Sequence, residues 1–204
     1  TCAVPEHAPG PPPRHASLPG CFTNAVTLAA WPFVAAGVVE DDVFVSAVTG
    51  SSGSGRTASA GTHHPVRHGD LRAYSPMAHR HEAEMAALLG AARGGREPEV
   101  AFVPHSGPYV RGIHATVRMT LRDPMSEGEL ATLAATAYAA SPFVHVGGRP
   151  PRLVEVVGTN RCGLGLAVRG RTLVVLSVID NLVKGAAGGG IQWMNRQFGL
   201  ADDC

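Results

Sequence analysis

Leu18-Pro19-Gly20-Cys21-Phe22 opens a long apolar segment that runs to Gly37, and this junction is the most informative place in the sequence. Proline and glycine favour a tight turn, and the alanine-, valine- and leucine-rich residues after them predict a helix that ends near Gly37. Because Trp31-Pro32 lies inside this segment, we expect a kink or an early end there. Cys21 therefore falls at or beside the N-terminus of a helix.

The position of Cys21 suggests covalent catalysis. Unpaired backbone N–H groups and the helix dipole favour negative charge at a helix N-terminus, so a thiol there tends toward the nucleophilic thiolate. A cysteine before an apolar helix also fits a second interpretation, a buried small hydrophobic residue. Cys2, Cys162 and Cys204 have no comparable setting, and we expect Cys162 to lie in the core.

The composition predicts a folded core and excludes several classes of partner. The 204 residues are 45% hydrophobic and 16% charged, and the apolar runs argue against disorder. No run is long enough to span a membrane. A net charge of +1 gives no electrostatic signature for nucleic acid or a membrane surface. The cysteine spacings match neither a metal site nor a disulfide framework, so we expect no metal and a cytoplasmic location.

Patterns along the rest of the chain predict an α+β fold with mostly antiparallel strands. Apolar residues alternate along 109–121, as in a half-buried strand. Ser126 and Glu129 match the capping signature of a helix start. A last helix is expected over 180–198, with Asp180 as its N-cap. Further strands are expected at 42–49, 99–104, 152–157, 163–168 and 172–179, and a further helix at 78–89.

The glycine-rich segment 50–57, GSSGSGRT, nearly matches a phosphate-binding P-loop. Arg56 stands where that motif needs lysine, and the residues that follow are poor helix formers, although the motif needs a helix at once. Two alternatives remain, a flexible turn and a loop whose backbone closely approaches a ligand. His63-His64 is most simply a loop pair, because no third metal ligand is suitably spaced.

Several short motifs occur along the chain. Each motif alone is a weak signal, but the ordered set is specific. Four are PGCF at 19–22, TGSSGSGR at 49–56, HRHEAE at 79–84 and IDNLVKG at 179–185, with VRGI at 110–113 and VGTN at 157–160 between the last two. Together they resemble the N-acetyl-gamma-glutamyl-phosphate reductase family of arginine biosynthesis over nearly the whole chain. The departures from the family pattern are Leu18, Thr23-Asn24 and residues 82–85, which leave the cysteine and both histidines in place.

The resemblance implies a reductive dephosphorylation. A cysteine forms a thioester from an acyl phosphate, and NADPH delivers hydride to give a semialdehyde. The expected reaction is NADP(H)-dependent reduction of N-acetyl-glutamyl 5-phosphate to N-acetyl-glutamate 5-semialdehyde and phosphate. A similar enzyme of lysine biosynthesis, which acts on a carrier-linked aminoadipyl phosphate, is the first alternative. A non-catalytic remnant that serves as an assembly module is the second.

The resemblance also implies roles for single residues. Cys21 matches the nucleophile, and His79 and His81 match the acid–base region. Since alternate positions of an extended segment face opposite ways, we expect only one histidine to reach the thiol, and we favour His79 without excluding His81. Glu84 is expected to hold the imidazole in one tautomer.

Substrate and cofactor residues follow from the same resemblance. Arg80 and Arg111 are expected to bind the substrate, and the planar fork of Arg111 suits a carboxylate or phosphate. The residues expected to line the nicotinamide side of the cofactor are Ser52, Gly53, Ser54, Asn181 and Lys184.

The expected organisation has three parts. Residues 1–20 form an irregular N-terminal arm. Residues 21–179 form a catalytic, substrate-binding and dimerisation domain like that of glyceraldehyde-3-phosphate dehydrogenase, with helices on one face of the sheet. Residues 180–204 form a C-terminal helix that would pack on a Rossmann domain. No strand–GxGxxG–helix unit opens the sequence, so we expect that cofactor domain to be largely absent and NADPH binding to be weak. We also expect the protein to be a homo-oligomer, a dimer or tetramer.

Overall fold

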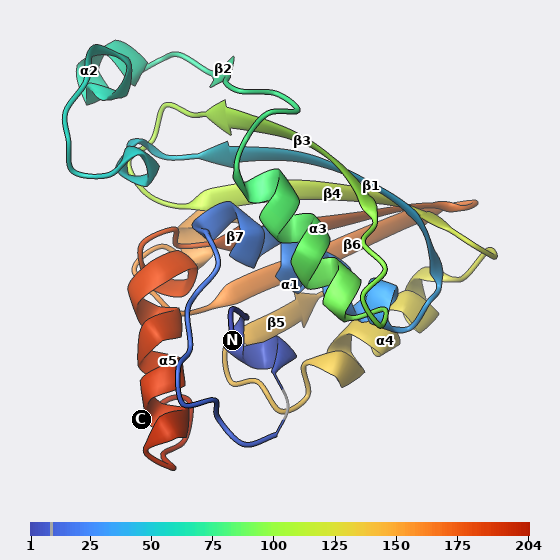
Figure 1. Cartoon of the computed structure of the whole chain (residues 1–204). Coiled ribbons are helices and arrows are strands. Elements are labelled where there is room, and N and C mark those ends of the chain that lie inside the picture. Colours follow the sequence, from blue (N-terminus) through green and yellow to red (C-terminus); the bar gives the residue numbers. More distant parts are fainter. Residues whose placement is uncertain (9) are drawn as a thin grey trace.

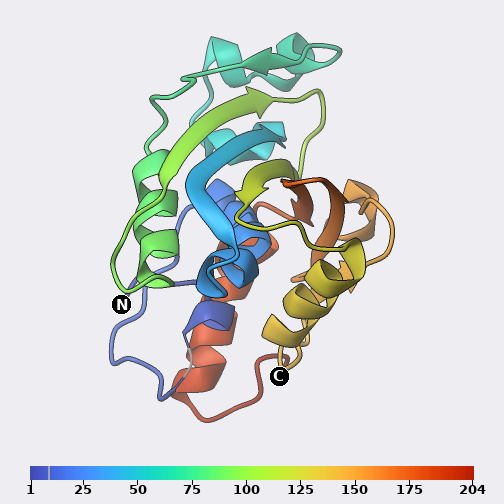
Figure 2. The same ribbon diagram turned by 90° about the vertical axis from the view of Figure 1, so that its right-hand side faces the viewer.

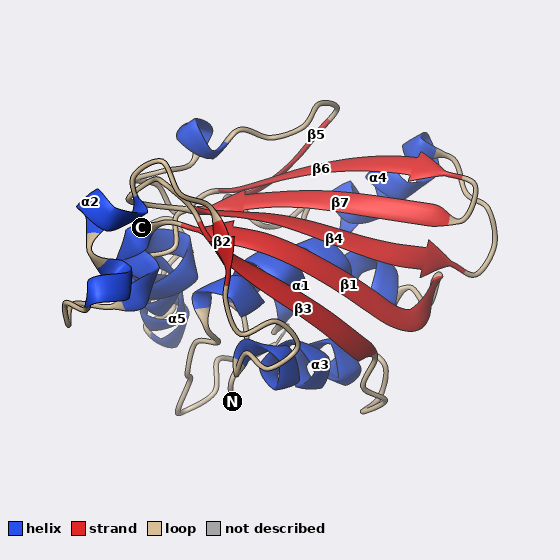
Figure 3. Ribbon diagram, turned by 90° about the horizontal axis from the view of Figure 1, so that it is seen from above, coloured by secondary structure: helices blue, strands red, loops and turns tan. Residues whose placement is uncertain are grey.

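A mixed β-sheet organises the fold, and the main helices cover one of its faces (Figures 1 and 3). The computed structural model describes residues 1–8 and 10–204. Within them, seven strands form one sheet in the order β2-β3-β1-β4-β7-β6-β5. The strands are β1 Val39–Thr49, β2 Arg72–Ala73, β3 Glu99–Ser106, β4 Ile113–Leu121, β5 Val144–Gly147, β6 Cys162–Arg169 and β7 Thr172–Ile179.

The helices differ widely in burial. In Figure 2, α3 and α4 lie on opposite sides of the molecule with α1 between them. Nearly every residue of α1 is buried, from Phe22 to Val34, because this helix is enclosed by the sheet and by other helices. The helices are α1 Cys21–Ala35, α2 His64–Arg67, α3 His81–Ala91, α4 Glu127–Ala137 and α5 Gly188–Gln197, the last preceded by a π-helical turn, Val183–Ala187.

Strand pairing confirms the α+β class with a mostly antiparallel sheet. The pairs β1·β4, β4·β7, β6·β7 and β2·β3 are antiparallel, whereas β1·β3 and β5·β6 are parallel. In β4 the expected alternation is confirmed, because Ile113, Ala115, Val117 and Met119 are fully buried. The parallel β1·β3 pair brings Thr49 beside Ser106 at one end of the sheet.

The strand expected over 152–157 is wrong. Leu153–Glu155 is a short 3-10 helix, and β5, which no pattern predicted, takes the edge position instead. The Glu155 carboxylate accepts a hydrogen bond from the backbone N–H of Arg152 at 3.2 Å and pairs with Arg149 at 2.6 Å. These local contacts close a turn where a strand would have to stay extended.

Pro32 was expected to kink α1 or end it early, and it does not end the helix. Proline has no N–H to donate to the carbonyl of Leu28, four residues earlier. The hydroxyl of Tyr138 donates to that carbonyl at 2.6 Å and so replaces the missing bond. The helix continues to Ala35, and Gly37 follows with φ of +69°, a conformation that favours glycine.

The N-terminal arm is mostly irregular, as expected, but it packs closely on the rest of the chain. Val4 is buried, and the indole N–H of Trp193 in α5 donates to the carbonyl of Ala3 at 3.1 Å. The other side of α5 exposes apolar side chains, among them Met194 and Phe198. Within the described residues, no helix combines the length and apolar character that crossing a bilayer requires.

Candidate active site

Cys21 is the first residue of α1, and one carboxylate fixes the turn around it. Gly20 is the N-cap, with extended backbone angles. Its N–H donates to Oε2 of Glu84 at 2.8 Å, and the hydroxyl of Thr23 donates to the same oxygen at 2.5 Å. Glu84 was expected to orient an imidazole, but its hydrogen bonds run to the helix start. The physical reason is that a helix N-terminus carries unpaired N–H groups and partial positive charge.

His81 packs directly on the residue before Cys21. A Cβ added at Gly20 would lie 2.1 Å from Nε2 of His81, so only glycine leaves room for the imidazole. His81 is 8% exposed and begins α3. His79 lies behind it, with ring centroids 4.6 Å apart, and contacts Phe22 edge to face. The geometry therefore favours His81 as the partner of Cys21, whereas the sequence favours His79.

Replacing Gly20 by alanine is expected to displace the His81 ring. The added methyl group overlaps the imidazole, so we expect a loss of about 1–3 kcal/mol of stability, typical of overpacking, together with lower reactivity of Cys21. Urea unfolding and the rate of Cys21 alkylation measure the two effects. Gly128→Ala is the matched control, because open space surrounds Gly128. Equal effects of the two substitutions would contradict the proposed packing.

The resting thiol of Cys21 is not activated as expected. Burial raises its pKa above the ordinary value, as does the charge of Glu84. The backbone N–H groups of Phe22 and Cys21 and the charge of Arg80 lower the pKa, but burial outweighs them. The direction of this pKa shift is therefore opposite to the tendency toward thiolate expected from the helix N-terminus. A thiol with a raised pKa needs a nearby base to become a nucleophile.

His81, whose ring packs on Gly20, is the candidate for that base. Its pKa is lowered to about 4, because burial and the charges of His79 and Arg80 lower it more than the charge of Glu84 raises it. The imidazole is therefore neutral near pH 7 and can accept a proton. A cavity of about 290 Å³ lies beside it, lined by Gly20, Arg80, His81 and Glu84. The exposed Arg80, expected to bind substrate, thus borders the open side of the site.

Stability is expected to fall as the pH drops from about 6.5 toward 4. The pKa of His81 is lowered from 6.5 to about 4 in the folded state, so the unfolded chain binds more protons in this window and protonation favours unfolding. His81 contributes a slope of up to about 1.4 kcal/mol per pH unit, and His7, whose pKa burial lowers to about 3, adds its own contribution in the same window. Urea unfolding at several pH values measures it, with His81→Asn as the comparison. A His81→Asn variant that keeps the whole slope would contradict this account.

Arg111 lies on the turn before β4 and is held by an acidic partner. Its NH2 group lies 3.1 Å from the carboxylate of Asp180, which also accepts the N–H groups of Gly158 at 2.7 Å and Leu182 at 2.8 Å. Burial raises the pKa of Asp180, but these N–H groups and Arg111 lower it more, and the net shift is downward. Arg111 remains 37% exposed, so its guanidinium is oriented and still accessible.

The structure brings Ser52 and Asn181 together. The side-chain amide of Asn181 donates to the hydroxyl of Ser52 at 3.1 Å, and its oxygen accepts the N–H of Gly112 at 2.6 Å. Asn181 is buried, whereas Gly53 and Ser54 are exposed at the tip of the loop. A loop anchored at its base and open at its tip fits a ligand that lies against backbone. The structure thus brings together two of the five residues expected at the cofactor, Ser52 and Asn181, with Gly53 and Ser54 beside them.

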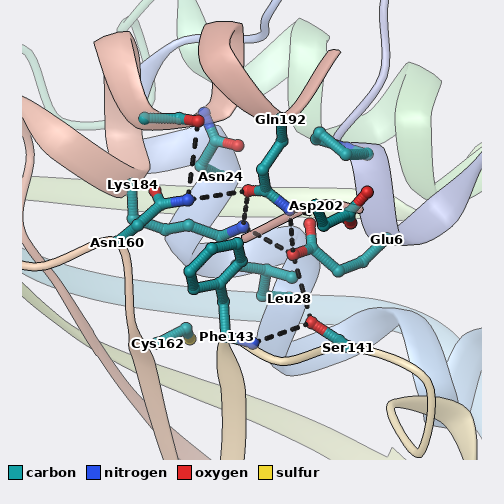
Figure 4. Close-up of polar contacts among 12 residues, drawn as sticks. Glu6, Asn24, Leu28, Ser141, Phe143, Asn160, Cys162, Lys184, Gln192 and Asp202 are labelled. Carbon is teal, nitrogen blue, oxygen red and sulfur yellow. Dashed lines mark hydrogen bonds and ion pairs between the residues drawn. The ribbon is translucent and has the colours of Figure 1, made fainter. Parts of the chain in front are cut away.

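Lys184 lies in a buried polar cluster with Glu6 and Gln192 (Figure 4). It is 1% exposed, and its ammonium group donates to Glu6 and Gln192, each at 2.6 Å. Burial raises the pKa of Glu6, but the charge and hydrogen bond of Lys184 lower it more. An ammonium group enclosed in this way argues against the expected contact with a cofactor. The π-helical turn Val183–Ala187 carries Lys184 inward, which no local pattern predicted.

No sequence pattern pointed to Tyr74 or Arg67. The Tyr74 ring lies 5.7 Å from His79, centroid to centroid. Burial raises the pKa of Tyr74 to about 12, the charge of Cys21 also raises it, and the charge of Arg67 lowers it. Tyr74 therefore lies within electrostatic reach of both residues. Among the described residues, no group of three or more His, Cys, Asp or Glu side chains could hold a metal ion.

Comparisons with known proteins give one family. A family model described as semialdehyde dehydrogenase, dimerisation domain, matches residues 21–181. The N-acetyl-gamma-glutamyl-phosphate reductase of Acidithiobacillus ferrooxidans is 44% identical over 189 residues, 91% of this chain and 55% of the relative. The enzyme of the same name from Methanosarcina acetivorans is 40% identical over 186 residues, 90% of this chain and 55% of the relative. The chain thus spans about half the length of these relatives.

Solved structures of two aspartate semialdehyde dehydrogenases have a fold similar to that of this chain. Aspartate semialdehyde dehydrogenase II from Vibrio cholerae, complexed with ASA, has a TM-score of 0.69 at 16% identity, over 97% of this chain and 67% of that one. A probable aspartate-semialdehyde dehydrogenase from Pseudomonas aeruginosa has a TM-score of 0.70 at 15% identity, over 95% and 67%. At such low identity the likeness concerns the fold alone.

Proposed function

Because the chain belongs to the semialdehyde dehydrogenase family, whose dimerisation domain it matches over residues 21–181, we propose that it is the catalytic part of an N-acetyl-gamma-glutamyl-phosphate reductase. The observation that carries this proposal is the placement of Cys21 at the start of α1 with His81 packed on Gly20. The reaction would convert N-acetyl-glutamyl 5-phosphate to the 5-semialdehyde and phosphate. The names of the relatives favour this substrate over the carrier-linked aminoadipyl phosphate.

The first chemical step is transfer of the acyl group to Cys21. The thiol proton passes to the neutral imidazole of His81, and the thiolate attacks the acyl carbon. The bond from the acyl carbon to the phosphate oxygen breaks, so phosphate leaves with its electron pair and a thioester remains on Cys21. Arg80, which borders the cavity, and Arg111, held by Asp180, are the candidates to bind the anionic groups of the substrate.

The second step needs a nicotinamide cofactor, which supplies the hydride that turns the thioester into the aldehyde. Ser52, Gly53 and Ser54, with Asn181 anchoring the loop, are the residues that would hold its nicotinamide end. His81 returns its proton to the sulfur of Cys21 once the aldehyde has left. NADP(H) rather than NAD(H) is proposed from the family resemblance.

We propose that the protein works as a homo-oligomer in the cytoplasm. The matched family model describes a dimerisation domain, and Phe44 on β1 is 42% exposed. Cys2, Cys21, Cys162 and Cys204 are all free thiols, which suits a reducing compartment.

Turnover in the reverse direction tests the proposed function. Protein that contains this chain, at its native length, is incubated with N-acetyl-glutamate 5-semialdehyde, phosphate and NADP⁺, and formation of the reduced cofactor is followed. We expect a rate that depends on phosphate and on Cys21. Turnover only with the carrier-linked substrate would move the assignment to lysine biosynthesis, and no turnover with either would favour the assembly module.

A further inference from the structure

A second cavity lies at the end of the sheet where the parallel strands β1 and β3 stop. Its volume is about 230 Å³, and Thr49, the last residue of β1, and Ser106, the last of β3, line it. Arg67, Arg72 and Tyr74 complete most of its wall. None of these residues lines the cavity beside His81. In open sheets, ligands commonly bind beyond the carboxyl ends of parallel strands.

Arg67 is a buried cation that no carboxylate among the described residues pairs with. It is only 3% exposed, and its NH1 and NH2 groups lie 3.4 Å from the hydroxyl of Ser54 and the carbonyl of Thr49. Its Nε is buried and has no hydrogen-bond partner in the structure. None of the ion pairs formed by the described residues includes Arg67. Such burial is unfavourable unless an anion compensates it.

A second cation and several hydroxyl groups surround the same space. Arg72 donates to the carbonyl of Gly61 at 2.7 Å, and its charge, like burial, lowers the pKa of Arg67. The hydroxyl-bearing residues Ser54, Tyr74 and Ser106 lie on the cavity wall, which carries no carboxylate. Two guanidinium groups with hydroxyl donors match the oxygens of a carboxylate or a phosphate.

Tyr74 connects this cavity to the candidate active site. It lines the cavity, and its ring contacts His79, whose own ring packs against His81. The charges of Cys21 and Arg67 both act on its hydroxyl.

We propose that this cavity is an oxyanion-binding subsite, in which Arg67 and Arg72 hold the carboxylate or phosphate group of the molecule that reacts at Cys21. The inference that an oxyanion binds stands on the cavity itself. Only the assignment of the anion to the substrate of Cys21 rests on the proposed function.

Binding of two anions to this chain tests the inference without any turnover. Inorganic phosphate and N-acetylglutamate are titrated separately at constant ionic strength, and thermal unfolding and calorimetry are recorded. We expect saturable binding of at least one anion. Phosphate binding alone would assign the site to the phosphate group, N-acetylglutamate binding alone to the substrate carboxylate, and either result supports the subsite. Binding of neither anion would overturn it.

Arg67→Met is the decisive variant. Removing a buried unpaired cation is expected to raise the unfolding temperature without anion and to weaken anion binding by about tenfold or more. Arg67→Lys, which keeps the charge without the fork, provides a second measurement if the methionine variant folds poorly, with intermediate binding expected. Arg171→Met is the control, because Arg171 pairs with Glu40 beside the start of β7, at the opposite end of the sheet.

The outcomes separate this proposal from the proposed function. Anion binding that Arg67→Met leaves unchanged overturns the subsite even if the reductase activity is found. Loss of binding in Arg67→Met but not in Arg171→Met supports the subsite even if the protein reduces no acyl phosphate.

Discussion

Replacing Cys21 by serine is expected to lower the rate of acyl-phosphate reduction by about 10³-fold or more, the scale of loss seen when an enzyme's nucleophile is removed. Cys21 begins α1 beside His81, and a serine hydroxyl there is far harder to deprotonate than a thiol. A neutral imidazole with a pKa of about 4 is a weak base and cannot compensate for that difference.

Initial rates of the phosphate-dependent reaction measure this effect. Cys204→Ser is the matched control, because Cys204 is an exposed free cysteine far along the chain from the site, and it should keep full activity. Activity that survives Cys21→Ser would contradict the covalent mechanism. Activity lost equally in both variants would point to a general loss of folding.

Replacing Lys184 by alanine is expected to destabilise the protein by about 3–5 kcal/mol, the cost of breaking a buried ion pair. Both side chains are almost fully buried, with 0% exposure for Lys184 and 1% for Glu6. Without the ammonium group, the carboxylate of Glu6 and the amide of Gln192 lose their shared partner (Figure 4). The carboxylate already has one oxygen, Oε2, without a hydrogen bond.

Urea unfolding of matched variants measures this cost. Arg171→Met removes an exposed ion pair with Glu40 and a hydrogen bond to the carbonyl of Leu121, and is expected to cost about 1–2 kcal/mol. If Lys184→Ala does not fold, the double variant Glu6→Gln with Lys184→Met removes both charges and should recover much of the stability. A Lys184→Ala variant as stable as Arg171→Met would contradict the role of this pair in holding the N-terminal arm.

Features set by neighbouring residues could be predicted from the sequence. The capping box of Ser126 and Glu129 is present, because it needs only residues three apart. The alternation along β4 predicts which side chains are buried, since the period of a strand is two. The start of α1 at Cys21 also follows from local turn and helix signals.

Features set by distant residues could not be predicted. The hydroxyl that lets α1 pass Pro32 comes from Tyr138, far along the chain. The oxygen that pairs with Lys184 belongs to Glu6 in the N-terminal arm. No local pattern carries such contacts, so the sequence could show neither how α1 passes Pro32 nor that Lys184 is enclosed.

In the candidate site, the positions of the residues could be predicted from the sequence, whereas their chemical properties could not. Motif order located Cys21, both His79 and His81, and Glu84, with His79 favoured, and the structure brings His81 and Glu84 to the start of α1. Their properties depend on packing, because burial sets the direction of the pKa shifts of the thiol and the imidazole. The packing around Cys21 is tight, because a Cβ added at Gly185 would lie 2.8 Å from the Cβ of Cys21.

The central claim is that Cys21 receives the acyl group, and the mass of the intact protein tests it most directly. The chain is mixed with N-acetyl-glutamyl 5-phosphate without any cofactor, so the reaction stops at the thioester. We predict release of phosphate and one adduct with the mass of the acyl group, mapped to Cys21, removed by hydroxylamine and absent in Cys21→Ser. An unmodified Cys21, or an adduct of the same yield on another residue in Cys21→Ser, would contradict the account.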